Sequence, residues 1–138
     1  MKCLNMVLPV AIIFGTSTAH ATNKTPIEQR YSPTHTRCMN TGDAGQGITS
    51  GMIACSETEW SFQDGKLNQA YKMVISRLPA IRQDELRRSE RNWIKTRDAI
   101  CAKELTGEFA GGSMSRVTWL GCLVDETIKR TITLEHYR

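Results

Sequence analysis

The sequence has few histidines, no C-x-x-C pair and no long apolar run. It contains three histidines among 138 residues, and the two outside the N-terminal leader, His35 and His136, lie near opposite ends of the chain, which does not indicate a zinc site. A membrane-spanning helix needs roughly 20 apolar residues, and the apolar stretch at 4–15 is short and interrupted by Pro9. We therefore expect no bound metal and, after processing, no contact with a membrane.

Strand periodicity and catalytic groupings are also missing. No segment alternates apolar and polar residues with a period of two, and Ser113 has no histidine placed to activate it. Glu57, Glu59 and Asp64 invite comparison with glycosidase carboxylates, but glutamates are the ordinary covering of an exposed helix. The glycine-rich segment 40–47 lacks the preceding strand and the Lys-Ser/Thr of a phosphate loop. We expect no catalytic residues, no cofactor and no enzymatic activity.

The N-terminus is typical of a secretory signal peptide. Lys2 gives a positive start, a short apolar stretch follows, and Ala19-His20-Ala21 places small residues where a signal peptidase cuts. We expect residues 1–21 to be removed after Ala21, which leaves a mature chain that is periplasmic or secreted.

Helical spacing begins near Ser50. The first expected helix ends before Pro79, a second starts near Asp84, and a third spans 115–136. The apolar stripe of the first helix is expected to comprise Trp60, Asp64, Leu67, Tyr71, Val74 and Leu78. Residues 22–49 should form an irregular arm before a helical domain at 50–138. The fold class is all-α, a small and mostly antiparallel bundle of three main helices.

Four cysteines remain once Cys3 leaves with the signal peptide. In a small exported domain they imply two disulfides, for which three pairings exist. We predict Cys101–Cys122, because a turn between antiparallel helices brings these residues together. We also predict Cys38–Cys55, because the arm can fold back onto the first helix.

Two motifs indicate a family. They are Asp64-x-x-Leu67-Asn68-x-x-Tyr71 and Trp93-x-x-x-Arg97-Asp98-x-x-Cys101. Together with pieces from Met52 to Leu134, they resemble the lysozyme inhibitor LprI-like family of small exported bacterial proteins. The chain departs from that pattern at Glu90, where the family usually has glutamine. The resemblance implies a helical, disulfide-linked, periplasmic or secreted protein, with lysozyme inhibition as the activity that gives the family its name.

Six polar residues belong to the same pattern: Asp64, Asn68, Arg97, Asp98, Thr127 and Arg130. They form either a set that binds a partner or a hydrogen-bonded network between the helices. We favour the structural network, because each buried polar group without a partner costs about 1–3 kcal/mol. A guanidinium and a carboxylate can satisfy each other, so we expect Arg97 to pair with Asp64.

The charge balance limits the class of partner. The net charge is +4, and +3 without Lys2, which is too mild and dispersed for nucleic acid. We expect a protein partner, a lysozyme-like muramidase, contacted through loops 40–47 or 106–113, with Trp60 or Phe62 as anchors. Lysozymes are usually basic, so a charge of +3 gives no electrostatic steering. The alternatives are an immunity or accessory protein for an envelope toxin or secretion system, or an envelope structural protein.

Overall fold

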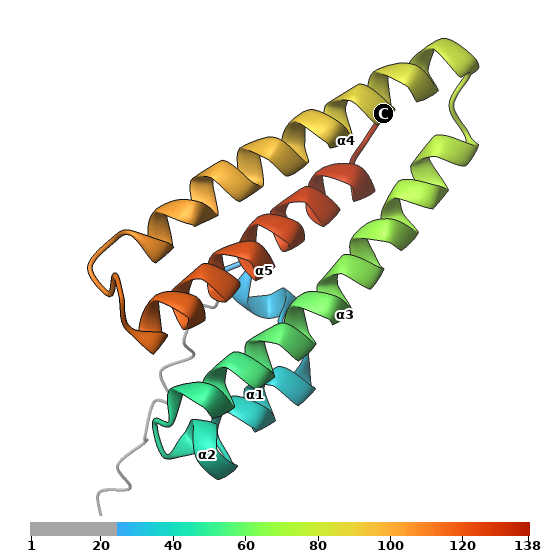
Figure 1. Cartoon of the computed structure of the whole chain (residues 1–138). Coiled ribbons are helices and arrows are strands. Elements are labelled where there is room, and N and C mark those ends of the chain that lie inside the picture. The colour runs from blue at the N-terminus through green and yellow to red at the C-terminus, as the bar shows by residue number, and fades with distance from the viewer. Residues whose placement is uncertain (1–24) are drawn as a thin grey trace, which may run out of the picture.

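The computed structural model describes residues 25–138, so the predicted signal peptide lies outside the described residues. Within this range the chain is helical and has no strand. The three long helices are α3 (Thr49–Ser76), α4 (Ala80–Cys101) and α5 (Ser113–Glu135) (Figure 1). The short elements are η1 (Glu28–Arg30), α1 (Pro33–Met39), α2 (Gly42–Gly45) and η2 (Ala102–Leu105). The predicted all-α bundle is confirmed, and no helix among these is both long and apolar enough to cross a membrane.

The two helices that pack most closely, α3 and α5, run in the same direction. The connecting helix α4 runs antiparallel to both and lies on the far side of α5 from α3 in the view of Figure 1. The Thr49 and Ser113 hydroxyls are 2.7 Å apart at one end of the pair. Buried leucine, isoleucine and valine side chains hold the pair together, and each contributes about 1.5–3 kcal/mol. The largest on α5 are Leu120, Leu123, Val124, Ile128 and Leu134, and Leu86 of α4 is buried against the same core.

The buried face of α3 is rotated from the predicted stripe. Its buried residues are Cys55, Ser56, Glu59, Gln63, Leu67, Ala70 and Val74. Leu67 and Val74 belong to both sets. Trp60, Asp64 and Tyr71 are only half-buried and lie on the side that faces α4. The difference arises because Glu59 and Gln63 are polar, so hydrophobic periodicity does not assign them to the core.

The start of α4 differs from the prediction. The helix begins at Ala80, directly after Pro79, and not near Asp84. Pro79 has φ −66° and ψ 156°, the extended conformation usual for the residue that precedes a helix. Asp84 lies inside the helix, where its Oδ1 is 2.7 Å from Nη1 of Arg87, an ordinary surface pair three residues apart.

The N-terminal segment is not the irregular arm that we predicted. It contains α1 and α2, because Ser32 accepts a hydrogen bond from the backbone N–H of His35 and Pro33 occupies the first helical turn. The second short helix packs closely on α3. A Cβ at Gly51 would lie 2.6 Å from the backbone nitrogen of Ala44, so only glycine allows this approach.

Both predicted disulfides are present. The Cα atoms of Cys38 and Cys55 are 5.8 Å apart, and those of Cys101 and Cys122 are 5.5 Å apart. The first bond ties α1 to α3, and the second ties the end of α4 to α5. Each closes a loop of a size that contributes roughly 3 kcal/mol in the chain-entropy model.

Candidate functional site

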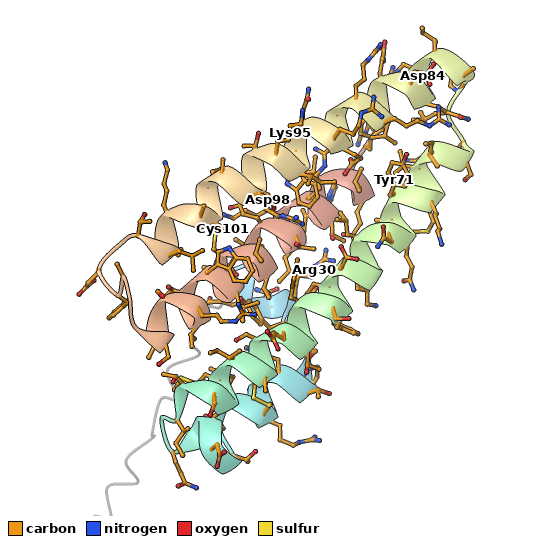
Figure 2. All side chains as sticks on the ribbon, in the orientation of Figure 1. Arg30, Tyr71, Asp84, Lys95, Asp98 and Cys101 are labelled. Atoms are coloured by element: carbon orange, nitrogen blue, oxygen red, sulfur yellow. A yellow bond between two sulfur atoms is a disulfide. The ribbon has the colours of Figure 1, made fainter. Side chains whose placement is uncertain are left out.

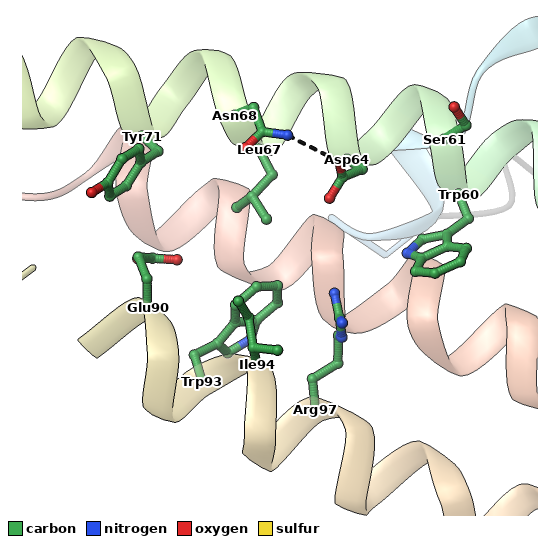
Figure 3. Close-up of a pocket in the computed structure, with 10 residues that line it drawn as sticks. All are labelled: Trp60, Ser61, Asp64, Leu67, Asn68, Tyr71, Glu90, Trp93, Ile94 and Arg97. Carbon is green, nitrogen blue, oxygen red and sulfur yellow. Dashed lines mark hydrogen bonds between the residues drawn. The ribbon is translucent and has the colours of Figure 1, made fainter. Parts of the chain in front are cut away.

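An open groove lies between α3 and α4 (Figure 3). The backbones of the two helices make few close contacts with each other, because α3 packs on α5 and α4 is held by α5 and η2. The groove has a volume of about 480 Å³, within the range of roughly 300–1,000 Å³ of small-molecule sites. Its lining comprises Trp60, Ser61, Asp64, Leu67, Asn68 and Tyr71 from α3, and Glu90, Trp93, Ile94 and Arg97 from α4.

The two sequence motifs meet at this groove. Asp64, Leu67 and Tyr71 follow one another at intervals of three and four residues, which places them on one face of α3. Trp93 and Arg97 do the same on α4, and the two sets point toward each other (Figure 3). Tyr71 lies on the side of α3 that faces α4, whereas Lys95 projects from the outer side of α4 (Figure 2).

Arg97 is the cation of the groove. Its guanidinium carbon lies 5.0 Å from the ring centroid of Trp93 and 5.9 Å from that of Trp60, distances at which a cation is attracted to an aromatic face. Its Nε and Nη2 donate to Oδ1 of Asp98 at 2.9 and 2.8 Å, and 11% of the side chain is exposed.

The predicted ion pair between Arg97 and Asp64 is wrong. Asp64 instead accepts a hydrogen bond from Nδ2 of Asn68 at 2.9 Å. The groove keeps the two walls apart, and the neighbouring Asp98 already supplies Arg97 with a carboxylate. Asp64 and Arg97 therefore each form hydrogen bonds with a residue of their own helix.

The remaining predicted polar residues occupy two other places. Arg130 on α5 reaches α4, where its Nε donates to Glu90 at 3.0 Å and its Nη2 donates to Ser89 at 2.8 Å. Arg130 and Glu90 side chains are each 14% exposed. Thr127 is fully buried and donates to the carbonyl of Leu123 at 2.7 Å. Asp64 thus pairs with Asn68 within α3, and Arg97 pairs with Asp98 within α4. Thr127 bonds within α5, and Arg130 bridges α5 to α4.

Glu59 is a buried carboxylate that sequence analysis misassigned to an exposed face. It is 2% exposed and accepts hydrogen bonds from the backbone N–H of Ser32 at 3.0 Å, from the Ser32 hydroxyl and from Nε2 of Gln63 at 2.7 Å. Gln63 also donates to the carbonyl of Arg30 at 2.8 Å. This cluster fastens the N-terminal segment to α3. The four-residue spacing from Cys55 to Glu59 and Gln63 was the signal that could have revealed it.

Aromatic residues of the N-terminal segment complete this attachment. The Tyr31 hydroxyl donates to Oδ1 of Asp125 at 2.8 Å, and burial, reinforced by that carboxylate, raises the pKa of Tyr31. The Tyr31 and His35 rings lie 5.0 Å apart. Burial lowers the pKa of His35, and the charge of Glu59 opposes the shift.

A second candidate surface is the exposed connection 102–112 between α4 and α5, called the 102–112 loop below, which comprises η2 and most of the predicted contact loop 106–113. The Cys101–Cys122 disulfide closes its base. Inside the loop, the N–H of Ala110 donates to the Gly107 carbonyl at 3.0 Å, and Phe109 is 44% exposed. The other predicted contact loop, 40–47, is occupied by α2 and packs on α3 instead.

The predicted anchors lie on different surfaces. Phe62 on α3 is 46% exposed and does not line the groove, whereas Trp60 does. No three histidine, cysteine, aspartate or glutamate side chains converge on a metal position within residues 25–138. The groove and the 102–112 loop are therefore the two candidate binding surfaces of the described chain.

Comparison with known proteins identifies a family whose model matches most of this chain. The family model described as lysozyme inhibitor LprI matches residues 38–134. An uncharacterised protein of Rhizobium meliloti (strain 1021) is 32% identical over 95 residues, which cover 59% of this chain and 67% of that protein. No solved structure matches the chain. The range matched by the family model contains both disulfides, the groove and the 102–112 loop.

Proposed function

We propose that this chain, which belongs to the lysozyme inhibitor LprI family, is an exported protein that inhibits a lysozyme by binding it. Two features support export. The four cysteines of the described chain are all in disulfides, which persist in oxidising compartments, and the first residues have the pattern of a signal peptide. The proposed location is therefore the periplasm or the cell exterior.

The 102–112 loop is the proposed inhibitory surface, and its geometry is the observation that supports it best. An inhibitor must place a rigid, exposed element in or across the cleft of the enzyme. This loop is exposed along its whole length, yet the Cys101–Cys122 bond and its internal turns restrict its conformations. Such preorganisation lowers the entropy cost of binding.

The chemistry of the loop suits a basic enzyme. Leu105 and Phe109 are 42% and 44% exposed, and aromatic side chains such as Phe109 are enriched at protein interfaces. The loop contains two carboxylates, Glu104 and Glu108, and one cation, Lys103, so its local charge is −1 although the chain carries +4. Local complementarity of this kind speeds association with a positive partner.

An inhibition assay tests the proposal. The mature chain, beginning at Thr22, is added in increasing amounts to lysozymes of several classes that are clearing a suspension of cell walls. Inhibition of at least one lysozyme that saturates near equal molar amounts is the expected result. No inhibition of any class would overturn the proposal and favour an immunity or accessory role for an envelope toxin or secretion system.

A further inference from the structure

We propose that the groove between α3 and α4 is a binding site for an uncharged glycan. Its aromatic side chains, Trp60, Tyr71 and Trp93, would pack against the C–H faces of sugar rings, and its polar side chains would bond to hydroxyl groups. The inference does not depend on lysozyme inhibition, because the groove and the 102–112 loop are separate surfaces with no lining residue in common.

The composition of the groove is the first argument. The faces of a pyranose ring carry C–H groups, while its edge carries hydroxyls that both donate and accept hydrogen bonds. A matching site needs flat apolar surfaces beside polar groups of both kinds. The groove offers three aromatic residues along its two walls, with Asp64 and Asn68 on one wall and Arg97 on the other (Figure 3).

Unused hydrogen-bonding groups are the second argument. The Trp60 indole N–H is buried and has no hydrogen-bond partner among the described residues. A buried donor without a partner costs about 1–3 kcal/mol, which a ligand acceptor in the groove would recover. Within residues 25–138, Asp64 uses one carboxylate oxygen for Asn68, and its other oxygen forms no hydrogen bond. The groove thus keeps at least one donor and one acceptor free.

The charges of the groove favour a neutral ligand over an ionic one. Glu90 is neutralised by Arg130 and Arg97 by Asp98, so Asp64 is the one groove charge without an opposite charge in the described chain. An anion would meet this surplus negative charge. The Trp60 and Trp93 rings, which would otherwise attract a cation, already lie close to the Arg97 guanidinium. A neutral ligand with its own donors and acceptors avoids both conflicts.

The walls also favour a glycan over a peptide. Extended peptides usually bind by hydrogen bonding to free backbone groups at a sheet edge. Both walls of this groove are helices, α3 and α4, whose backbone groups are bonded within the helix. Only side chains are available to the ligand, and they are the planar amide, carboxylate and guanidinium groups that pair readily with hydroxyls.

Binding of neutral oligosaccharides to the mature chain tests the proposal. The probes are tetramers of N-acetylglucosamine, of β-1,4-glucose and of α-1,4-glucose, measured by isothermal titration and by tryptophan fluorescence. At least one should bind saturably. Asp64→Ala and Trp60→Phe should each weaken binding by about tenfold, equivalent to about 1.4 kcal/mol. The second change retains an aromatic ring and removes the unpaired N–H.

Phe62→Ala is the matched control, since Phe62 is an exposed aromatic residue of α3 outside the groove, and it should leave glycan affinity unchanged. Circular dichroism establishes that each variant is folded, and Asp64→Asn replaces any variant that is not. Failure of all three probes to bind at millimolar concentration would overturn the proposal. Equal affinities of Asp64→Ala, Trp60→Phe and Phe62→Ala, or saturable binding of amphipathic peptides but of no glycan, would also overturn it.

Discussion

At the scale of single residues, Glu59 is the charged group on which the N-terminal segment most depends. Its carboxylate receives three hydrogen bonds from Ser32 and Gln63 in a site from which water is excluded. Hydrogen bonds to a charged acceptor are stronger than neutral ones, and the partners would be left unsatisfied without it. Glu59, which the sequence suggests to be a solvent-exposed helix residue, therefore helps to fix the position of α1.

Replacing Glu59 by alanine should destabilise the protein. Each buried donor left without an acceptor costs about 1–3 kcal/mol, so we expect a melting temperature lower by about 10 °C or more. Glu57→Ala is the control on the same helix, because Glu57 is exposed and pairs only with exposed Arg116, a contact worth about 0–1 kcal/mol. Thermal melts followed by circular dichroism measure both. Equal melting temperatures for the two variants would contradict the role assigned to Glu59.

His35 should make stability depend on pH. Its pKa is lowered by burial in the folded protein, whereas an unfolded histidine has a pKa of about 6.5. Well above that pH both states are neutral. As the pH falls below about 6.5, the unfolded state binds a proton first, so stability decreases until the pH passes the folded pKa.

The measurement is the change in melting temperature between neutral and mildly acidic pH. His35→Gln should reduce that change, since glutamine has no proton to gain. His136→Gln is the control, because His136 is an exposed residue near the C-terminus. An unchanged pH dependence in His35→Gln would show that other groups cause it.

At the scale of helices, the sequence predicts the three long helices well. It does not predict α1 and α2, and it predicts the buried face of α3 only in part. Pro79 and the glycines before Ser113 mark boundaries of the long helices, and the Cys101–Cys122 disulfide follows from the antiparallel order of α4 and α5. The buried face of α3 was misassigned because Glu59 and Gln63 are buried by partners in the N-terminal segment. Hydrophobic periodicity reports apolar burial and contains no information about such a polar cluster.

The groove could be anticipated only in part. The motif spacings correctly place Asp64 and Tyr71 on one face of α3, and Trp93 and Arg97 on one face of α4. They do not determine whether the two faces close on each other or stay apart. That depends on the distance between the helices, which is set by the packing of α5 against both and by the Glu90–Arg130 bridge. The Arg97–Asp64 prediction assumed contact, and the open groove explains why it failed.

The Cys101–Cys122 bond should matter more for inhibition than Cys38–Cys55 does. Replacing both members of either pair by serine removes roughly 3 kcal/mol of stability. Only loss of the Cys101–Cys122 bond also frees the base of the 102–112 loop, so only that variant should lose inhibitory potency beyond its loss of folded protein. Denaturant melts and inhibition titrations at a temperature where both variants are folded separate the two effects. Equal potency of the two variants would contradict the proposed role of the loop.

At the scale of the whole molecule, the two proposed binding surfaces of the described chain are separate and lie on one frame. The close pair of α3 and α5 is the frame, and both disulfides connect other elements to it. The 102–112 loop lies at one end of the bundle, while the groove runs between α3 and α4 along its side (Figures 1 and 3). A protein partner at the loop and a glycan in the groove could therefore be bound by one molecule.

The most direct test of the account compares two phenylalanines in a titration against an inhibited lysozyme. Phe109 in the loop and Phe62 on α3 are nearly equally exposed, at 44% and 46%, so serine at either position removes a similar apolar group. We predict that Phe109→Ser raises the inhibition constant by about tenfold or more, as expected for a central contact residue, and that Phe62→Ser leaves it unchanged. An unchanged constant for Phe109→Ser, or a larger increase for Phe62→Ser, would contradict the account.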